Sequence, residues 1–187
     1  MKKAALHNLG CKVNAYETEA MQHLLEEAGY EIVPFTQKAD VYVINTCSVT
    51  NMADRKSRQM LHKAKKNNPD SIVVAAGCYV QTSEKEVLND LSVDIVIGND
   101  RKHDLVRLLE EYSLDSVNDT VDDINDGKHD FEELFIDQTK EHMRAFIKVQ
   151  DGCNQFCSYC IIPYARGRVR SRRFENVIAE VERLAAN

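Results

Sequence analysis

The sequence predicts an α/β protein, with a five-stranded doubly wound parallel sheet in the first 112 residues and one further strand–helix unit after residue 142. Three observations carry this prediction. Short runs rich in Val and Ile are typical of parallel strands that are buried on both faces. The stretches between these runs place apolar residues at helical spacing. The alternation of the two patterns indicates strand–helix–strand units with right-handed crossovers.

The predicted strands occupy residues 3–9, 30–35, 41–45, 72–76 and 94–97. The helix after the first strand should bury one face, made of Tyr16, Ala20, Met21, Leu24, Leu25 and Ala28. The helix after the third strand should bury Met52, Met60, Leu61 and Ala64. The expected strand order is 2-1-3-4-5, which is the flavodoxin-like arrangement.

A strongly acidic stretch follows at residues 113–142. It holds ten Asp and Glu residues against two Lys, a local charge of −8, whereas the whole chain carries −6. The rest of the chain is therefore at +2, which is compatible with a nucleic-acid partner. We expect a linker here, in which Val117, Val121 and Ile124 could form one helical turn against a domain.

Residues 143–187 read as the start of a second domain. A strand is expected at 143–150 and a helix at 174–186. The helix should bury Val177, Ile178, Val181 and Leu184. The predicted division of the chain is therefore 1–112, 113–142 and 143–187.

The composition of the chain indicates the cellular compartment in which the protein works. The 187 residues contain no apolar run of membrane-spanning length, and the start of the chain lacks a signal-peptide core. Six cysteines without a secretory signal indicate a reducing compartment, where metal binding or catalysis is a more common role for cysteine than a disulfide. We expect a cytoplasmic protein.

Three cysteines lie in one short loop, at the spacing Cys153-x3-Cys157-x2-Cys160. Each thiolate can bind a different iron of one [4Fe-4S] cluster, which leaves the fourth iron open to a substrate. A zinc site would need a second pair of ligands that the neighbouring sequence does not complete. A redox dithiol of Cys157 and Cys160 would leave Cys153 unexplained. The spacing favours the cluster.

The other three cysteines each follow a predicted strand. Cys11, Cys47 and Cys78 come after the first, third and fourth strands, which are neighbours in the expected order. Their thiols should therefore meet at one edge of the sheet, where Gly10 and Gly77 would let the backbone approach a bulky inorganic group. The alternative is that each cysteine is a small buried apolar residue.

The cysteine loop resembles the signature of radical S-adenosylmethionine (SAM) enzymes. The flanking sequences Val149-Gln150-Asp151-Gly152 and Ile161-Ile162-Pro163-Tyr164-Ala165-Arg166-Gly167 narrow the resemblance to the methylthiotransferases. The segments Leu9-Gly10-Cys11-Lys12-Val13-Asn14, Asn45-Thr46-Cys47-Ser48 and Ala76-Gly77-Cys78-Tyr79 resemble the amino-terminal domain of that family. The strand–helix unit after residue 142 would then begin a radical-SAM barrel.

The resemblance implies two [4Fe-4S] clusters and SAM as cofactors. A radical-SAM cluster would be held by Cys153, Cys157 and Cys160, with Tyr159 as a candidate SAM contact. An auxiliary cluster that delivers sulfur would be held by Cys11, Cys47 and Cys78. In the family, one SAM methylates the sulfur and another yields the radical that removes hydrogen from the substrate carbon. No individual catalytic residue is assigned.

The motif around Cys11 indicates the substrate. Gly-Cys-Lys-Val-Asn followed by Tyr-Glu-Thr-Glu resembles the enzymes that act on N6-threonylcarbamoyladenosine next to the tRNA anticodon. The family alternatives are isopentenyladenosine in tRNA and a ribosomal protein, and a non-catalytic zinc or RNA-binding module is the alternative from another class. Family members also need an electron donor. Family members continue well beyond the position that corresponds to residue 187, so we do not expect this chain alone to catalyse the reaction.

Three arginines after the cysteine loop, Arg166, Arg168 and Arg170, are candidates for contacts with tRNA phosphates. Alternatively, these arginines pair with acidic groups between the domains.

Overall fold

The computed structural model describes residues 1–112, 118–127, 129–137 and 144–186. Its centre is a parallel sheet with the order β2-β1-β3-β4-β5-β6. The strands are β1 (Lys3–Asn8), β2 (Glu31–Ile32), β3 (Val41–Thr46), β4 (Ile72–Gly77), β5 (Ile95–Ile97) and β6 (Asn118–Thr120). The predicted doubly wound parallel sheet and its order 2-1-3-4-5 are confirmed. A sixth strand, β6, extends the sheet beyond β5 from within the predicted linker.

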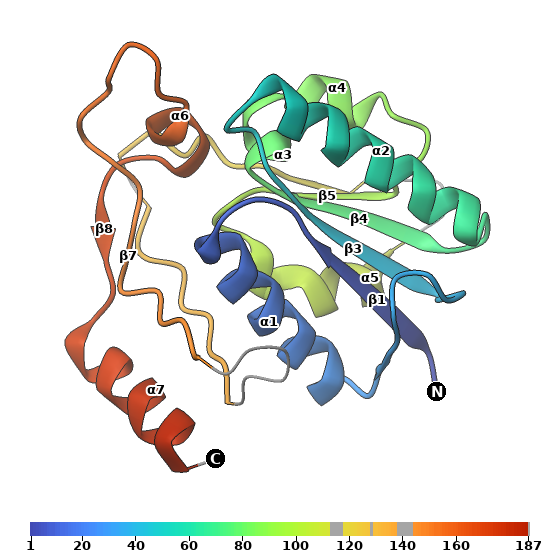
Figure 1. Ribbon diagram of the computed structural model, residues 1–187, viewed down its shortest axis with the longest axis horizontal. Coiled ribbons are helices and arrows are strands. Elements are labelled where there is room, and N and C mark those ends of the chain that lie inside the picture. Colours follow the sequence, from blue (N-terminus) through green and yellow to red (C-terminus); the bar gives the residue numbers. More distant parts are fainter. Residues whose placement is uncertain (113–117, 128, 138–143, 187) are drawn as a thin grey trace.

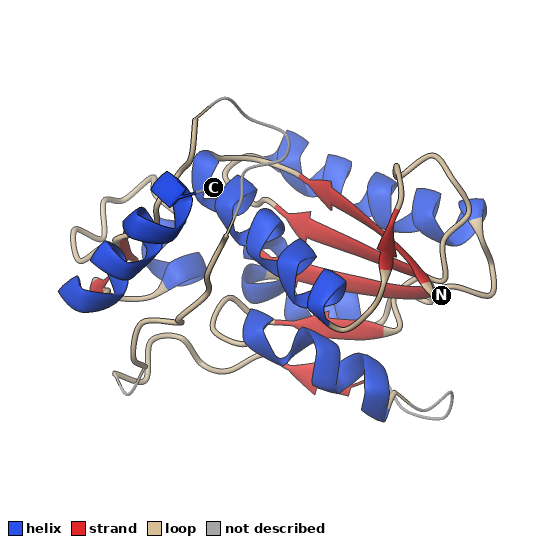
Figure 2. Ribbon diagram, turned by 90° about the horizontal axis from the view of Figure 1, so that it is seen from below, coloured by secondary structure: helices blue, strands red, loops and turns tan. Residues whose placement is uncertain are grey.

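Helices cover both faces of the sheet (Figures 1 and 2). The helices of this part are α1 (Lys12–Glu27), α2 (Asn51–Asn67), α3 (Cys78–Thr82), α4 (Glu84–Leu88), η1 (Lys102–Asp104) and α5 (Leu105–Glu111). One core packs α2, α3 and α4 on residues such as Tyr42 and Ile44, and the other packs α1 and α5 on Val43 and Val74. Alternate residues of one strand point to opposite faces, so β3 contributes to both cores.

The predicted helix faces are mostly correct. Tyr16, Ala20, Met21 and Leu25 of α1 and Leu61 and Ala64 of α2 are buried. Ala28 is exposed because it follows the last residue of α1, and Met52 is 59% exposed in the first turn of α2.

The carboxyl-terminal part lies beside the carboxyl ends of the central strands (Figure 1). It contains β7 (Gln150–Asp151), α6 (Ile162–Arg166), β8 (Arg170–Ser171) and α7 (Phe174–Ala186), with β7 antiparallel to β8. The predicted helix 174–186 is confirmed. Of the expected strand 143–150, only Gln150 is in a strand, and Met143 lies outside the described residues. The assignment of this unit to a radical-SAM barrel stays a prediction.

The predicted buried face of α7 is wrong. Ile178 and Val181 are 39% and 41% exposed, and Val177 and Leu184 are only partly buried. The fully buried residue is Glu180, whose carboxylate lies 2.9 Å from the Tyr16 hydroxyl oxygen and pairs with Arg172. A polar contact therefore decides which side of α7 faces the rest of the protein.

The described part of the acidic stretch lies against the sheet domain. Leu134 and Ile136 pack on Tyr16 and Ala20, and the Tyr16 hydroxyl donates to the Leu134 carbonyl at 2.6 Å. Val121 and Ile124 follow β6 without forming the expected helical turn. Val117 lies outside the described residues.

The division into 1–112, 113–142 and 143–187 stays a prediction. Within the described ranges, no helix is both long and apolar enough to cross a membrane.

Candidate functional site

The sheet places three cysteines at one edge. Cys11 precedes α1, Cys47 follows β3, and Cys78 is the first residue of α3 directly after β4. Strands β1, β3 and β4 are parallel neighbours, with Asn8 opposite Asn45 in the register. The three cysteines therefore follow strand ends at the same edge, which we call the rim. Cys47 and Cys78 are buried and Cys11 is exposed.

A glycine and an asparagine connect the first two rim loops. Gly10 has φ +106°, and a Cβ added there would lie 2.7 Å from the Cys47 Sγ. Only glycine therefore fits without strain between the two loops. The Asn14 amide nitrogen donates to the Leu9 carbonyl at 2.8 Å and to the Thr46 carbonyl at 2.9 Å. These two carbonyls immediately precede the Gly10-Cys11 pair and Cys47.

The third rim cysteine has an amide neighbour of its own. The Asn99 amide nitrogen lies 3.6 Å from the Cys78 Sγ and donates to the Ala165 carbonyl at 2.6 Å. Ala165 belongs to α6, so this asparagine also joins the rim to the element that follows the second set of cysteines. Burial raises the pKa of the Cys78 thiol, and the charge of Arg166 opposes that rise.

The second set lies in the loop between β7 and α6. Its base is closed by a hydrogen bond from the Cys153 amide to the Gly167 carbonyl at 3.0 Å. Within the loop, the Cys160 amide donates to the Cys157 carbonyl at 2.9 Å. Cys157 is exposed, and Cys153 and Cys160 are partly buried. Tyr159, the candidate SAM contact, is 91% exposed.

A buried cluster of charged side chains lies between the two sets of cysteines. Its members are Glu17, Lys102, Lys148, Asp151 and Arg166. Glu17 is fully buried and accepts from Lys148 at 2.7 Å and from Arg166 at 2.9 Å. Burial alone would raise the pKa of Glu17, but Arg166, Lys102 and Lys148 hold it well below its ordinary value.

Sequence reasoning missed this charge cluster, although α1 carries a signal of it. Glu17 lies within the apolar stripe of that helix, next to Tyr16 and three residues before Ala20. A carboxylate in such a stripe is rarely buried without a partner, so its position predicts a buried cation. The identity of the cations could not be read from the sequence, because Arg166 is 149 positions away.

Comparison with known proteins identifies the family. The model of the uncharacterized protein family UPF0004 matches residues 3–98, about half of the chain. The chain belongs to this family.

Curated relatives of this UPF0004 member are methylthiotransferases. The threonylcarbamoyladenosine tRNA methylthiotransferase MtaB of Bacillus subtilis is 46% identical over 186 residues, 98% of this chain and 41% of the relative. The tRNA-2-methylthio-N(6)-dimethylallyladenosine synthase of a Thermoanaerobacter species is 35% identical over 96% of the chain and 39% of the relative. The ribosomal protein uS12 methylthiotransferase RimO of Dictyoglomus thermophilum is 34% identical over 97% and 42%.

The predicted resemblance to the methylthiotransferases is therefore confirmed. The chain spans about two-fifths of the length of these relatives.

The donor chemistry of both cysteine sets in this UPF0004 chain fits iron–sulfur clusters. All six cysteines are free, and each set supplies three thiols. Among the described residues, no three His, Cys, Asp or Glu side chains are arranged to hold a single metal ion. A [4Fe-4S] cluster makes a different demand, since each thiolate binds a separate iron. The glycine at position 10 lets the loop that carries Cys11 lie directly against the Cys47 side chain, which brings these two loops of the rim together.

The RNA contacts expected of Arg166, Arg168 and Arg170 stay predictions, and the structure places two of these side chains in buried ion pairs. Arg166 is 4% exposed, and its guanidinium forms ion pairs with Glu17 and Asp151. The side chain of Arg170 is 9% exposed and pairs with Asp100. Arg168 is exposed and lies over the Phe156 ring at 5.1 Å, so its contact with RNA stays a prediction. The alternative expectation, pairing with acidic groups, describes Arg166 and Arg170.

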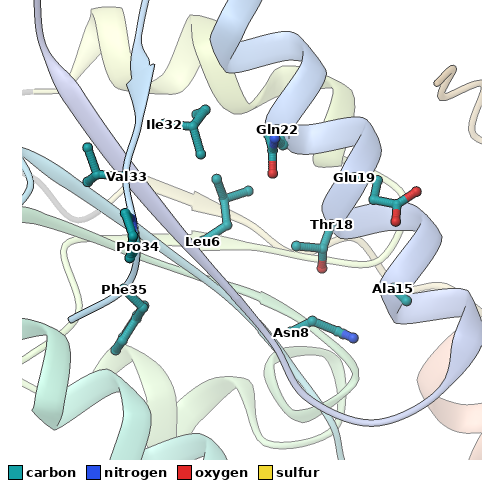
Figure 3. A pocket seen from close by; sticks show the side chains of 10 residues that line it. All are labelled: Leu6, Asn8, Ala15, Thr18, Glu19, Gln22, Ile32, Val33, Pro34 and Phe35. Carbon is teal, nitrogen blue, oxygen red and sulfur yellow. The ribbon is translucent and has the colours of Figure 1, made fainter. Parts of the chain in front are cut away.

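A separate pocket lies between α1, β1 and residues 32–35 (Figure 3). Its volume is about 380 Å³, and Thr18 and Gln22 of α1 face Leu6 and the segment ending at Phe35. Ile32, the second residue of the two-residue strand β2, also lines it. None of the six cysteines is among its lining residues, so it is distinct from the rim.

Proposed function

We propose that this chain takes part in tRNA modification, as a radical-SAM methylthiotransferase that acts on carbon 2 of N6-L-threonylcarbamoyladenosine next to the anticodon. The observation that carries the proposal is the pair of cysteine sets, three thiols at the rim and three in the following loop. The substrate rests on identity: 46% to a threonylcarbamoyladenosine enzyme against 35% and 34% to a dimethylallyladenosine and a ribosomal-protein enzyme.

In this proposal each cysteine set holds one [4Fe-4S] cluster. Cys11, Cys47 and Cys78 hold the auxiliary cluster, and Cys153, Cys157 and Cys160 hold the radical-SAM cluster. When bound, the two clusters and SAM supply the sulfur, the methyl group and the one-electron chemistry. The protein orients them and excludes water.

The chain's own residues account for these tasks. Burial of Cys47 and Cys78 keeps water from two of the three rim ligands. Asn14 fixes the rim backbone through the Leu9 and Thr46 carbonyls. Tyr159 is accessible for SAM and Arg168 for a phosphate.

The partners in this proposal are tRNA and an electron donor, and the compartment is the cytoplasm, where tRNA is modified. Because the chain spans about two-fifths of its relatives, we do not expect residues 1–187 to turn over alone.

Nucleoside mass spectrometry tests the proposal. A strain that lacks the full-length gene should lose the 2-methylthio group from N6-threonylcarbamoyladenosine and keep it on isopentenyl-type adenosines, because the two N6 substituents differ in charge and polarity. The full-length gene should restore the product, and the same gene with Cys157→Ala should not. Loss of the isopentenyl product instead would contradict the substrate. A modification lost only from a ribosomal protein would contradict tRNA as the partner.

A further inference from the structure

One buried arginine touches both sides of the space between the cysteine sets. Arg166 is the last residue of α6, six positions after Cys160. Its guanidinium donates to both carboxylate oxygens of Asp151 at 3.2 Å, two positions before Cys153. The same group donates to the Asn14 Oδ1 at 2.6 Å and to both carboxylate oxygens of Glu17 at 2.9 and 3.3 Å. The loop is thus bonded to α1, the helix that begins next to Cys11.

These contacts continue to every rim cysteine. The Asn14 Oδ1, which accepts the hydrogen bond from Arg166, also lies 3.7 Å from the Cys11 Sγ. The Asn14 amide nitrogen donates to the carbonyl of the residue that precedes Cys47. Asn99 joins the backbone of α6 to Cys78. Helix α6 also packs on α3, which begins with Cys78.

The charge cluster carries one more positive than negative charge. Lys102, Lys148 and Arg166 face Glu17 and Asp151, and all five side chains are nearly or fully buried. Burying a charge without a counter-charge is costly. An anionic group at the rim, next to Arg166, would balance the excess. Thiolates and the cluster that they hold are anionic.

We propose that Arg166 is a positioning residue, which fixes the Cys153–Cys160 loop against the rim and supplies the positive charge that the rim site faces. This inference rests on the proposed function, because it assumes an iron–sulfur cluster at the rim. Reduction makes a cluster more negative, so a fixed positive charge beside it raises its reduction potential. Arg166 therefore has two separable effects, one on potential and one on loop geometry.

The potential is measured in the reconstituted Cys157→Ala chain, so that only the rim cluster contributes. Arg166→Gln should lower the midpoint potential enough to change the ratio of oxidised to reduced cluster about tenfold, which is about 59 mV for one electron. Arg173→Gln removes the same charge from an exposed position two residues after β8, the strand that pairs with β7, and should change the ratio less than twofold. Arg166→Lys keeps the charge and should also stay within about twofold of the parent.

Loop geometry is measured by hydrogen exchange in the iron-free chain. Both Arg166→Gln and Arg166→Lys should speed exchange at the Gly152 and Cys153 amides at least about tenfold, because neither side chain can form the two-pronged pairs of arginine. Arg173→Gln should leave these amides unchanged. If circular dichroism shows that Arg166→Gln is unfolded, the test rests on Arg166→Lys. Unchanged exchange at the Gly152 and Cys153 amides of Arg166→Lys would then overturn the proposal.

The outcomes separate this inference from the proposed function. If the parent chain binds iron at the rim but Arg166→Gln has the potential or the exchange rates of Arg173→Gln, the role of Arg166 is refuted and the proposed function stands. If the rim of the parent chain binds no iron, both are refuted.

Discussion

Replacing Glu17 with Gln should strongly destabilise the protein. Glu17 is fully buried, and its carboxylate contacts Lys148 at 2.7 Å, Arg166 at 2.9 Å and Lys102 at 3.3 Å. The substitution keeps the shape of the side chain but leaves three cations facing Asp151 alone. The NH2 group of the new amide is also a hydrogen-bond donor, and it would lie among the cationic donors of Lys102, Lys148 and Arg166. Removing one partner of a buried ion pair costs about 3–5 kcal/mol, a large part of the 5–15 kcal/mol typical of domain stability.

Urea denaturation followed by far-ultraviolet circular dichroism measures this loss. At pH 7, the free energy of unfolding should fall by about 3 kcal/mol or more, and the melting temperature by roughly 6–12 °C. The control is Glu27→Gln in the last turn of the same helix, where the side chain is 63% exposed. That change should stay within about 0.5 kcal/mol of the parent. A loss below about 1 kcal/mol for Glu17→Gln would refute the account of the charge cluster.

Three further predictions follow from the site. Because neighbouring cations hold the pKa of Glu17 well below its ordinary value of 4.5, its stabilisation is present above pH 4.5 and is lost as the pH falls further; urea midpoints from pH 7 to 3 should decline less steeply in Glu17→Gln. The reconstituted chain should bind about eight irons, and the variants Cys157→Ala and Cys47→Ala about four each. Metal analysis that finds stoichiometric zinc in place of iron would contradict the clusters. Gly10→Ala should cost about 1–3 kcal/mol and lower rim iron, because the new Cβ would meet Cys47. Gly29→Ala shares the positive φ without any neighbour within 4 Å, so equal effects of the two would contradict the steric argument.

The sheet could be predicted from the sequence because its signals are local. Residues 41–44 and 72–76 are apolar runs of the kind that a parallel strand buried on both faces needs. Strand β6 has no such signal. Its residues, Asn118–Thr120, are polar, and they form a strand because the chain returns beside the open edge of β5.

The rim could be predicted because strand order alone brings the three cysteines to one edge. The buried partners could not. Arg166 and Arg170 look like members of an exposed basic run, and only the fold brings them next to Glu17 and Asp100. The face of α7 cannot be predicted for the same reason, since contacts with Arg172 and Tyr16 bury Glu180 in place of its apolar neighbours.

Helix α1 has a consequence for how this protein can change in length. It starts beside Cys11, points Glu17 at the charge cluster, and places Tyr16 under Leu134 and Glu180. One residue inserted between Cys11 and Tyr16 would rotate everything after it by about 100° and shift it by about 1.5 Å. Every contact of α1 with the carboxyl-terminal part would be lost together. Insertions and deletions should therefore be absent from this turn and a half, whereas the exposed end of the helix near Glu27 can accept them.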